Sequence, residues 1–556
     1  MRRRWRSLLD ERSWEFAPHE RPTMPGSPAA PEHPRLRRAG YGLIALLVGV
    51  TGGLGNALVA VNTTTLQGAL GLYSNEVAWL PAAYVMTSIC INLVLIKFRQ
   101  EFGLRRFVAL TLLSYALITF SHLFVRGFGS AIAVRAASGV AGAGLSTLAL
   151  YYMIQAFPAR WRIRGVVLGI GVPQLATPMA RLFSTELLAE NEWRTLYLFE
   201  LGLALLSLAA VWMLPLPPSE RRKAFEPLDF LTFLLLASGM ALLCAVLAQG
   251  RIQWWTEARW IGWALALAIP LVAAALVIEH NRSNPLLNTR WLGSADIVRF
   301  AVVAILVRIC LSEQTYAAVG LLNTLGLNND QLHDLFGLVL AATAAGSIAS
   351  AIAIDPNRLA HPIMLAVGLV AIAAFADAHA TNLTRAPQMY LTQTVLAFSA
   401  TFFMGPALLF GMSRALQQGP AYIVSFSALF GITQSLGGLA GSALLGTYQT
   451  IREKAHSHEI VQDIVLTNPI VANRLQQSSG IFGPHVLDPA LRNAQGAGLL
   501  SQQITREANI LAYNDTFFLI GVLASLTTLY LGFLLVRAEW RRRRAESLSI
   551  AAAGPR

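Results

Sequence analysis

Long apolar runs separated by short polar connectors dominate the chain. A helix needs roughly 20 predominantly apolar residues to cross a bilayer, and we count fourteen such runs. The predicted spans lie near residues 40–62, 77–96, 107–125, 131–157, 165–187, 194–214, 227–248, 260–279, 296–321, 332–353, 362–380, 388–411, 423–448 and 513–536. The pattern therefore predicts an all-α polytopic membrane protein.

Basic residues are distributed unevenly between the connectors on the two sides of the predicted bundle. The richer set carries Lys97, Arg99, Arg105, Arg106, Arg160, Arg162, Arg164, Arg221, Arg222, Lys223, Arg282 and Arg290. The short loops of the other set carry only Arg126, Arg251, Arg259 and Arg385. Positive charge marks the cytoplasmic side. Because residues 35–38 and 537–544 are also basic, we expect both termini in the cytoplasm, as an even number of spans requires.

The composition agrees with a membrane protein. Hydrophobic residues make up 55% of the chain and charged residues 13%, whereas a soluble domain carries about 25% charged residues. The net charge of +13 does not predict a nucleic-acid partner, because the basic residues cluster at the ends and in connectors, as they do on a cytoplasmic membrane face. Cys90, Cys244 and Cys310 lie in apolar runs, which predicts free thiols rather than disulfides or a zinc site.

Three segments fall outside the spans. Residues 1–39 join an arginine cluster to a proline-rich polar stretch, and no apolar core follows the arginines directly. This predicts a disordered cytoplasmic tail rather than a secretory signal. Residues 537–556 are predicted to be a basic cytoplasmic tail, and residues 449–512 form a long polar segment on the outer face.

The end of that outer segment has helical amphipathic spacing. Leu500, Ile504, Ala508 and Leu511 fall on one face of a helix. Such a face either packs onto the membrane domain or provides a docking surface for another protein. Long loops are often functional, so both alternatives remain open.

An arginine lies inside the fourth span, in "VRAASGVAGAGL" at residues 134–145. Arg135, Gly139, Gly142 and Ser146 share one helical face, and the small residues on it let a neighbouring helix approach closely. An intramembrane arginine usually has a partner or lines a watery pathway. A structural ion pair without a part in transport is the alternative.

Several stretches resemble the drug:proton antiporters of the EmrB/QacA type within the major facilitator superfamily. "RAASGVAGAG" looks like the arginine motif of the fourth span, and "KFRQEFGLRR", with Arg105 and Arg106, is similar to the basic loop motif but lacks its leading glycine and aspartate. The stretches at 76–87, 279–292 and 506–521 agree in order and spacing. The resemblance implies the major facilitator fold: a six-helix bundle at 40–214, a linker with spans seven and eight at 215–294, and a six-helix bundle at 295–536.

Two positions depart from the pattern of that family. The first span carries Asn56 where an aspartate is common, and an asparagine cannot carry a proton. The fifth span keeps Pro173 and Pro178 in "GVPQLATPMARL", loses most glycines and gains Arg181. The prolines predict a kinked helix near a cavity.

Proton coupling would then require another buried acid. The strongest candidate is Glu313 in span nine, with Arg308 and Arg299 nearby, because burial favours the neutral acid while an arginine favours the charged one. Glu200 in span six is second. Asp377 in span eleven lies nearer the outer boundary and is expected to be solvated. A static ion pair is the alternative for each.

The resemblance implies an exporter in the bacterial inner membrane that exchanges protons for small amphipathic or aromatic compounds. The sequence has no GxxxxGK[ST] loop, so we expect the proton-motive force rather than ATP or another cofactor to drive it. Arg135 would border the central cavity and bind an anionic group of the substrate or pair with Glu200. A periplasmic adaptor and an outer-membrane channel are the implied partners. An uptake carrier, an exporter of an endogenous metabolite or siderophore, and a non-transporting membrane sensor are the rival readings; no enzymatic motif is found.

Overall fold

The computed structural model describes residues 20–22, 26–188 and 193–552, and the fold is built from helices. Thirteen of the described helices are long and apolar enough to cross a membrane. The predicted ninth span is a further crossing made of three short pieces: α14 (Ala295–Cys310), the π-helical turn η4 (Glu313–Ala318) and α15 (Val319–Thr324). The prediction of an all-α membrane protein with about fourteen spans is therefore confirmed.

The first six spans form one group of helices. Their segments are α2 (Arg35–Val61), α5 (Trp79–Phe102), α6 (Leu104–Ser121), α7 (Phe128–Ala156), the fifth span in three pieces α8 (Arg162–Gly171), η3 (Val172–Leu175) and α9 (Ala176–Leu187), and α10 (Arg194–Met213). Short helices lie in the connectors: α3 (Thr63–Leu70), α4 (Ser74–Val77), η1 (His122–Phe124) and η2 (Ala159–Trp161). The break at η3 falls at Pro173, which agrees with the predicted kink.

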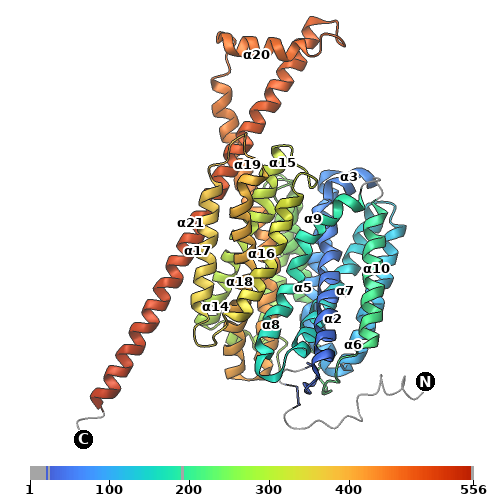
Figure 1. Ribbon diagram of the computed structural model, residues 1–556, viewed down its shortest axis with the longest axis vertical. Coiled ribbons are helices and arrows are strands. Elements are labelled where there is room, and N and C mark those ends of the chain that lie inside the picture. The colour runs from blue at the N-terminus through green and yellow to red at the C-terminus, as the bar shows by residue number, and fades with distance from the viewer. Residues whose placement is uncertain (1–19, 23–25, 189–192, 553–556) are drawn as a thin grey trace.

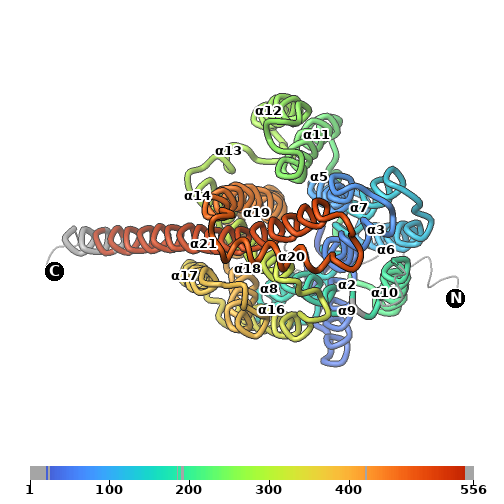
Figure 2. Tube along the Cα trace, turned by 90° about the horizontal axis from the view of Figure 1, so that it is seen from above, coloured from blue at the N-terminus to red at the C-terminus, as the bar shows by residue number. Residues whose placement is uncertain are grey.

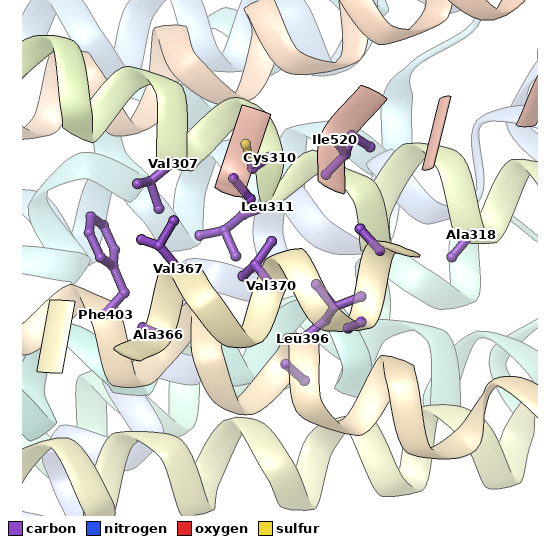
Figure 3. Packing of buried hydrophobic residues seen from close by; sticks show 14 of the residues in the cluster. Val307, Cys310, Leu311, Ala318, Ala366, Val367, Val370, Leu396, Phe403 and Ile520 are labelled. Atoms are coloured by element: carbon purple, nitrogen blue, oxygen red, sulfur yellow. The ribbon is translucent and has the colours of Figure 1, made fainter. Parts of the chain in front are cut away.

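The last six spans form the second group. They are the α14–η4–α15 crossing, α16 (His333–Ile352), α17 (Ala360–Asp377), α18 (Tyr390–Gln418), α19 (Pro420–Gln462) and α21 (Pro489–Ala552), with η5 (Ala386–Met389) before α18. Their apolar faces meet in a large core, part of which Figure 3 shows around Val307, Val367 and Leu396. Burial of these side chains holds the group together by close packing.

Spans seven and eight lie at the edge of the molecule (Figure 2) as α11 (Pro227–Gln249) and α12 (Arg259–His280), and α13 (Thr289–Leu292) follows them. A buried ionic network fixes them: Lys97 of α5 contacts Asp229 at 2.6 Å, and Arg282 contacts the same carboxylate at 2.8 Å. Arg282 also pairs with Glu226 and Glu279. The Asn284 amide and Arg282 hold the pKa of the Glu226 carboxyl below its usual range, so this acid is ionised at neutral pH.

The segment 449–512 is a helical hairpin rather than an irregular loop. α19 and α21 both continue past the bundle, and α20 (Pro469–Gly480) bridges their ends (Figure 1). We call the side with this hairpin the hairpin side, and the opposite side, where α2 begins, the basal side. On the amphipathic face predicted for this segment, Ala508 is buried, while Leu511 is 42% exposed. The predicted face is thus only partly covered.

The N-terminal segment is more ordered than predicted. α2 begins at Arg35 rather than at residue 40, and residues 26–29 are buried. The Ala29 amide donates to the Pro218 carbonyl, and the Gln155 amide donates to the Ala29 carbonyl. One backbone hydrogen bond and one from the Gln155 side chain thus anchor this stretch to the basal side, which corrects the prediction of disorder there. Residues 1–19 and 23–25 of the predicted tail lie outside the described residues. The C-terminal segment 537–552 continues α21 as a helix.

Candidate functional site

Arg135 of α7 is buried inside the first helix group, with 1% of its surface exposed. Its guanidinium donates to the Gly55 carbonyl at 2.6 Å, to the Asn56 Oδ1 at 2.9 Å and to the Leu80 carbonyl at 3.4 Å. It also lies over the Tyr84 ring, 5.0 Å from the centroid. These acceptors offset the desolvation of the cation, and Asn56 supplies a neutral oxygen where an aspartate would supply a charged one.

The predicted place of Arg135 beside a central cavity stays a prediction, but the glycines on its face of α7 pack against another helix. A Cβ on Gly139 would lie 2.2 Å from the Tyr84 carbonyl oxygen, and one on Gly142 would lie 2.1 Å from the Tyr84 hydroxyl. The glycine-lined face is therefore the face on which α5 packs. Arg135 ties α7 to α2 and α5, and it lines neither of the cavities between the two helix groups described below.

Glu200 of α10 is also buried, at 1% exposure, but does not pair directly with Arg135. Its Oε1 accepts hydrogen bonds from the Tyr115 hydroxyl at 2.7 Å and from the Thr119 hydroxyl at 3.4 Å. No ion pair of Glu200 with Arg135 or Arg181 is found in the described part of the chain. The predicted Arg135–Glu200 pair is thus replaced by hydroxyl contacts.

The second helix group contains a pair of buried carboxylates. Glu313 has no exposed surface and Asp377 is 5% exposed. The Gln393 side-chain amide donates to Asp377 at 2.9 Å and to Glu313 at 3.1 Å, so one neutral group contacts both acids. Two negative charges beside one amide repel each other in a medium of low dielectric constant.

Two predictions about this pair are wrong. Asp377 is not solvated, because the chain after α17 folds back over the helix end, where Ala380 hydrogen-bonds to Asn514 of α21. Arg308 does not pair with Glu313: its Nε donates to the Gln434 carbonyl of α19, and Arg299 instead contacts Asp296. Sequence reasoning missed Gln393, whose only signal is a polar residue in an apolar span.

The π-helical turn η4 begins at Glu313 itself. A π-turn inserts an extra residue into a helix, and such insertions occur often at functional sites. Here Glu313 faces Gln393, while the next residue, Gln314, lines a cavity and donates to the Gln393 backbone carbonyl. The widened turn thus connects the buried acid to the interface between the two helix groups.

Two cavities lie along that interface. The larger, about 280 Å³, is on the basal side and is mostly apolar, with α5, α7 and α8 on one wall and α18 and α19 on the other. The smaller, about 100 Å³, lies further toward the hairpin side. Its lining includes Pro178, Arg181, Arg308, Gln314 and Phe336.

Arg181 crosses the interface at the hairpin end of the smaller cavity. It donates to the Asn329 side chain at 3.1 Å, and its guanidinium carbon is 4.8 Å from the Phe336 ring centroid. Asn329 and Phe336 belong to the second helix group, so these contacts close the interface on the hairpin side. The predicted cavity beside the fifth-span prolines is therefore present.

The predicted conformational loop, with Arg105 half-buried and Arg106 exposed, lies on the basal side. Gly103 turns the chain there with φ of 86°. The Glu101 carboxylate accepts from the Ala224 and Phe225 amides. The loop thus contacts the linker between the helix groups, and a gating role for it stays a prediction. In the described residues, no group of three His, Cys, Asp or Glu side chains could hold a metal ion.

The family model of the Major Facilitator Superfamily matches residues 44–442, most of the length of the two helix groups and their linker. The chain belongs to the Major Facilitator Superfamily. It is therefore a membrane transporter rather than an enzyme. Its interface cavities occupy the position between the two bundles through which transport by rocking would take place.

Curated relatives of this superfamily member include transporters with drug-related names. The puromycin resistance protein pur8 of Streptomyces alboniger is 25% identical over 450 residues, 77% of this chain and 85% of that protein. The multidrug export protein EmrB of Haemophilus influenzae is 24% identical over 59% of this chain and 62% of that protein. The multidrug transporter mfsC of Aspergillus fumigatus is 26% identical over 43% of this chain and 46% of that protein. The chain thus spans less than two thirds of the last two.

Solved structures agree with the fold. The proton:xylose symporter XylE is 14% identical with a TM-score of 0.53, and the match covers 89% of this chain and 95% of XylE. The human organic anion transporter MFSD10 (TETRAN) is 15% identical with a TM-score of 0.52, and the match covers 89% of this chain and all of that one. At these identities the likeness shows the superfamily fold alone.

Proposed function

We propose that this transporter exchanges protons for small amphipathic or aromatic compounds and exports them from the cytoplasm across a bacterial inner membrane. The observation that carries the proposal is the Glu313–Gln393–Asp377 cluster, two buried acids that share one amide. Two acids this close in a low-dielectric interior repel each other when both are charged, so the pair can take up and release a proton. The resemblance to multidrug exporters supports the direction of transport.

The route from the acids to the substrate runs through Gln314. This residue lines the smaller cavity and hydrogen-bonds to the Gln393 backbone. A substrate that fills the cavity therefore contacts an element whose position depends on the acid pair. Gain or loss of a proton there would shift the balance between the two orientations of the bundles, as alternating access requires.

Transport in inside-out membrane vesicles tests this function. Acidification of the vesicle interior should drive accumulation of fluorescent aromatic compounds, and nigericin should abolish it by collapsing the pH gradient. Vesicles without the transporter provide the baseline. Accumulation only in right-side-out vesicles with an acidic exterior would indicate an uptake carrier, and no gradient-dependent movement in either orientation would favour a sensor.

We further propose that the α19–α20–α21 hairpin faces the periplasm and docks a periplasmic adaptor, which leads to an outer-membrane channel. Several apolar side chains at its tip are exposed, including Leu466 at 70%, Ile470 at 74%, Ile481 at 66% and Leu487 at 95%. Exposed apolar groups beyond the membrane domain are typical of a protein interface.

Deletion of residues 455–495, with a short polar turn in their place, is expected to remove resistance in cells. Transport into inside-out vesicles should remain within about twofold of the intact protein, because the bundles and cavities are untouched. Drug susceptibility in a pump-deficient host and vesicle transport are the two measurements. A matched variant carries Leu487→Ser and Ile470→Ser in the full hairpin. Full resistance in both variants would indicate a stand-alone pump.

A further inference from the structure

The smaller interface cavity is lined by two cations and no acid. Arg181 comes from α9 of the first bundle and Arg308 from α14 of the second. Each belongs to a membrane-spanning segment, where a charge without a counter-charge is costly. The remaining lining residues are apolar or neutral polar groups such as Gln174, Thr177 and Gln314.

The hydrogen bonds of these two arginines engage only a few of the N–H donors of each guanidinium. Among the described residues, Arg181 has one hydrogen bond, to the Asn329 side chain, and Arg308 has one, to the Gln434 backbone carbonyl. A guanidinium carries five N–H donors. No carboxylate of residues 20–22, 26–188 or 193–552 forms an ion pair with either arginine, which contrasts with the three acidic partners of Arg282.

A second unsatisfied group lies next to Arg308. Both polar side-chain atoms of Gln434 are buried, and neither finds a hydrogen-bond partner in the described part of the chain. Buried amides of this kind almost always have a partner in a protein. Gly437 and Gly438 follow one turn later, and a Cβ on Gly438 would lie 3.2 Å from Arg308 Nη2. The glycines thus make room for the guanidinium on α19.

We propose that this cavity binds the anionic group of the transported compound, a carboxylate, sulfonate or phosphate, between Arg181 and Arg308. This assignment rests on the transport function proposed above, and it makes the substrate an organic anion. Guanidinium groups bind such anions with paired N–H donors, and these charge-assisted bonds are among the strongest in proteins. The apolar body of the compound would extend into the larger, mostly apolar cavity on the basal side, whose lining also includes Arg99.

Arg181 and Arg308 come from different bundles, so an anion bound between them would link the two bundles. Because one arginine belongs to each bundle, a bound anion holds the two bundles together, as Asn329 and Phe336 do for Arg181 alone. Its release lets the two cations repel each other and favours separation of the bundles at this level. Substrate binding and bundle closure are therefore linked through the same two residues.

Binding to the purified full-length transporter, without any gradient, tests the proposal. The probes are 1-naphthoate, the neutral 1-naphthamide and the cationic 1-naphthylmethylammonium, which share one ring system. We expect 1-naphthoate to bind about tenfold or more tightly than the amide, the contribution of a good charge-assisted bond. Equal affinity for the three probes, or a preference for the cation, would overturn the proposal.

Arg181→Gln and Arg308→Gln are expected to weaken 1-naphthoate binding about tenfold or more and to leave 1-naphthamide binding within about twofold. The matched control is Arg299→Gln, an exposed arginine on the same helix as Arg308 that lines neither interface cavity. Lysine at 181 or 308 keeps the charge without the planar fork, so Arg181→Lys and Arg308→Lys should restore part of the preference.

Thermal stability without ligand separates a binding role from a structural one. If the arginines serve a ligand, each glutamine variant removes an uncompensated charge and unfolds at the same or a higher temperature. A large loss of stability in both glutamine variants, with no rescue of anion preference by lysine, would assign them to packing and overturn the proposal. Proton-driven export of cationic or neutral dyes without anion preference would overturn it too, while the proposed function would stand. Anion-selective binding without proton-driven transport would support the anion site and overturn the proposed transport function.

Discussion

Glutamine in place of Glu313 is expected to uncouple transport from the pH gradient. Glutamine keeps the size of the side chain but cannot carry a proton, so the acid pair loses the member with no exposed surface. Gradient-driven accumulation in inside-out vesicles should fall by about tenfold or more, because ionisable residues inside a membrane mark proton pathways. Substrate binding should stay near that of the intact transporter, because Glu313 lines neither interface cavity.

Glu200→Gln provides the matched comparison for this result. Glu200 is a buried acid of the other bundle, with hydroxyl partners from Tyr115 and Thr119 instead of a second carboxylate. We expect a milder loss of gradient-driven accumulation for that variant. Full pH-dependent transport by Glu313→Gln would reject the assignment and leave Glu200 as the deepest remaining acid.

Alanine in place of Arg135 is expected to destabilise the whole first bundle. The change removes the three hydrogen bonds that link α7 to Gly55, Asn56 and Leu80, and it leaves a cavity where the buried side chain packed between α7, α2 and α5. Hydrogen bonds to a charged group contribute about 1.5–3 kcal/mol each, and the cavity left by a large buried side chain adds to the loss. The temperature at which the detergent-solubilised protein loses its monodisperse peak should fall sharply. Arg135→Lys should lie in between, because an ammonium cannot satisfy the three acceptors in the geometry of the guanidinium.

Arg126→Ala is the control, since Arg126 is exposed in the connector before α7. Its unfolding temperature should match that of the unmodified protein. A stable, well-expressed Arg135→Ala variant that has lost transport would contradict the structural role and return Arg135 to the substrate pathway.

The helices could be predicted from the sequence because the bilayer leaves the backbone few choices. Every peptide group in lipid must find a partner within its own segment, so long apolar runs become helices. The interruption of the ninth span at Glu313 could not be predicted in this way, since hydropathy reports where a span lies and not the hydrogen-bonding pattern within its helix. The prediction that Arg135, Gly139 and Gly142 share one helical face was correct, but hydropathy does not say which helix packs against that face.

The partners of the site residues were the least predictable feature. Gln393 lies 80 residues from Glu313, and Gln434 lies 126 residues from Arg308. Sequence reasoning compares residues within one span, and Arg308 was expected near Glu313 because the two lie little more than one helical turn apart. Burial of Asp377 depends on the fold of the following connector over a helix end, and the position of a residue within its span does not report that. The resemblance to a family supplied the bundle arrangement, but the acid pair comes from the structure.

α19 and α21 run without a break from the second bundle into the hairpin. The hairpin therefore moves as a rigid extension of that bundle. Residues 449–462 alone add about 20 Å at 1.5 Å per residue beyond the bundle. With the pivot near the middle of a bilayer about 30 Å thick, the hairpin tip lies some 40 Å from it. A rotation of about 10°, similar to known rigid-body rotations, then moves the tip by roughly 7 Å. A small rocking motion inside the membrane is thus amplified at the tip (Figure 1). A protein bound to α20 must therefore either move with the bundle during each transport cycle or restrain the rotation of the bundle.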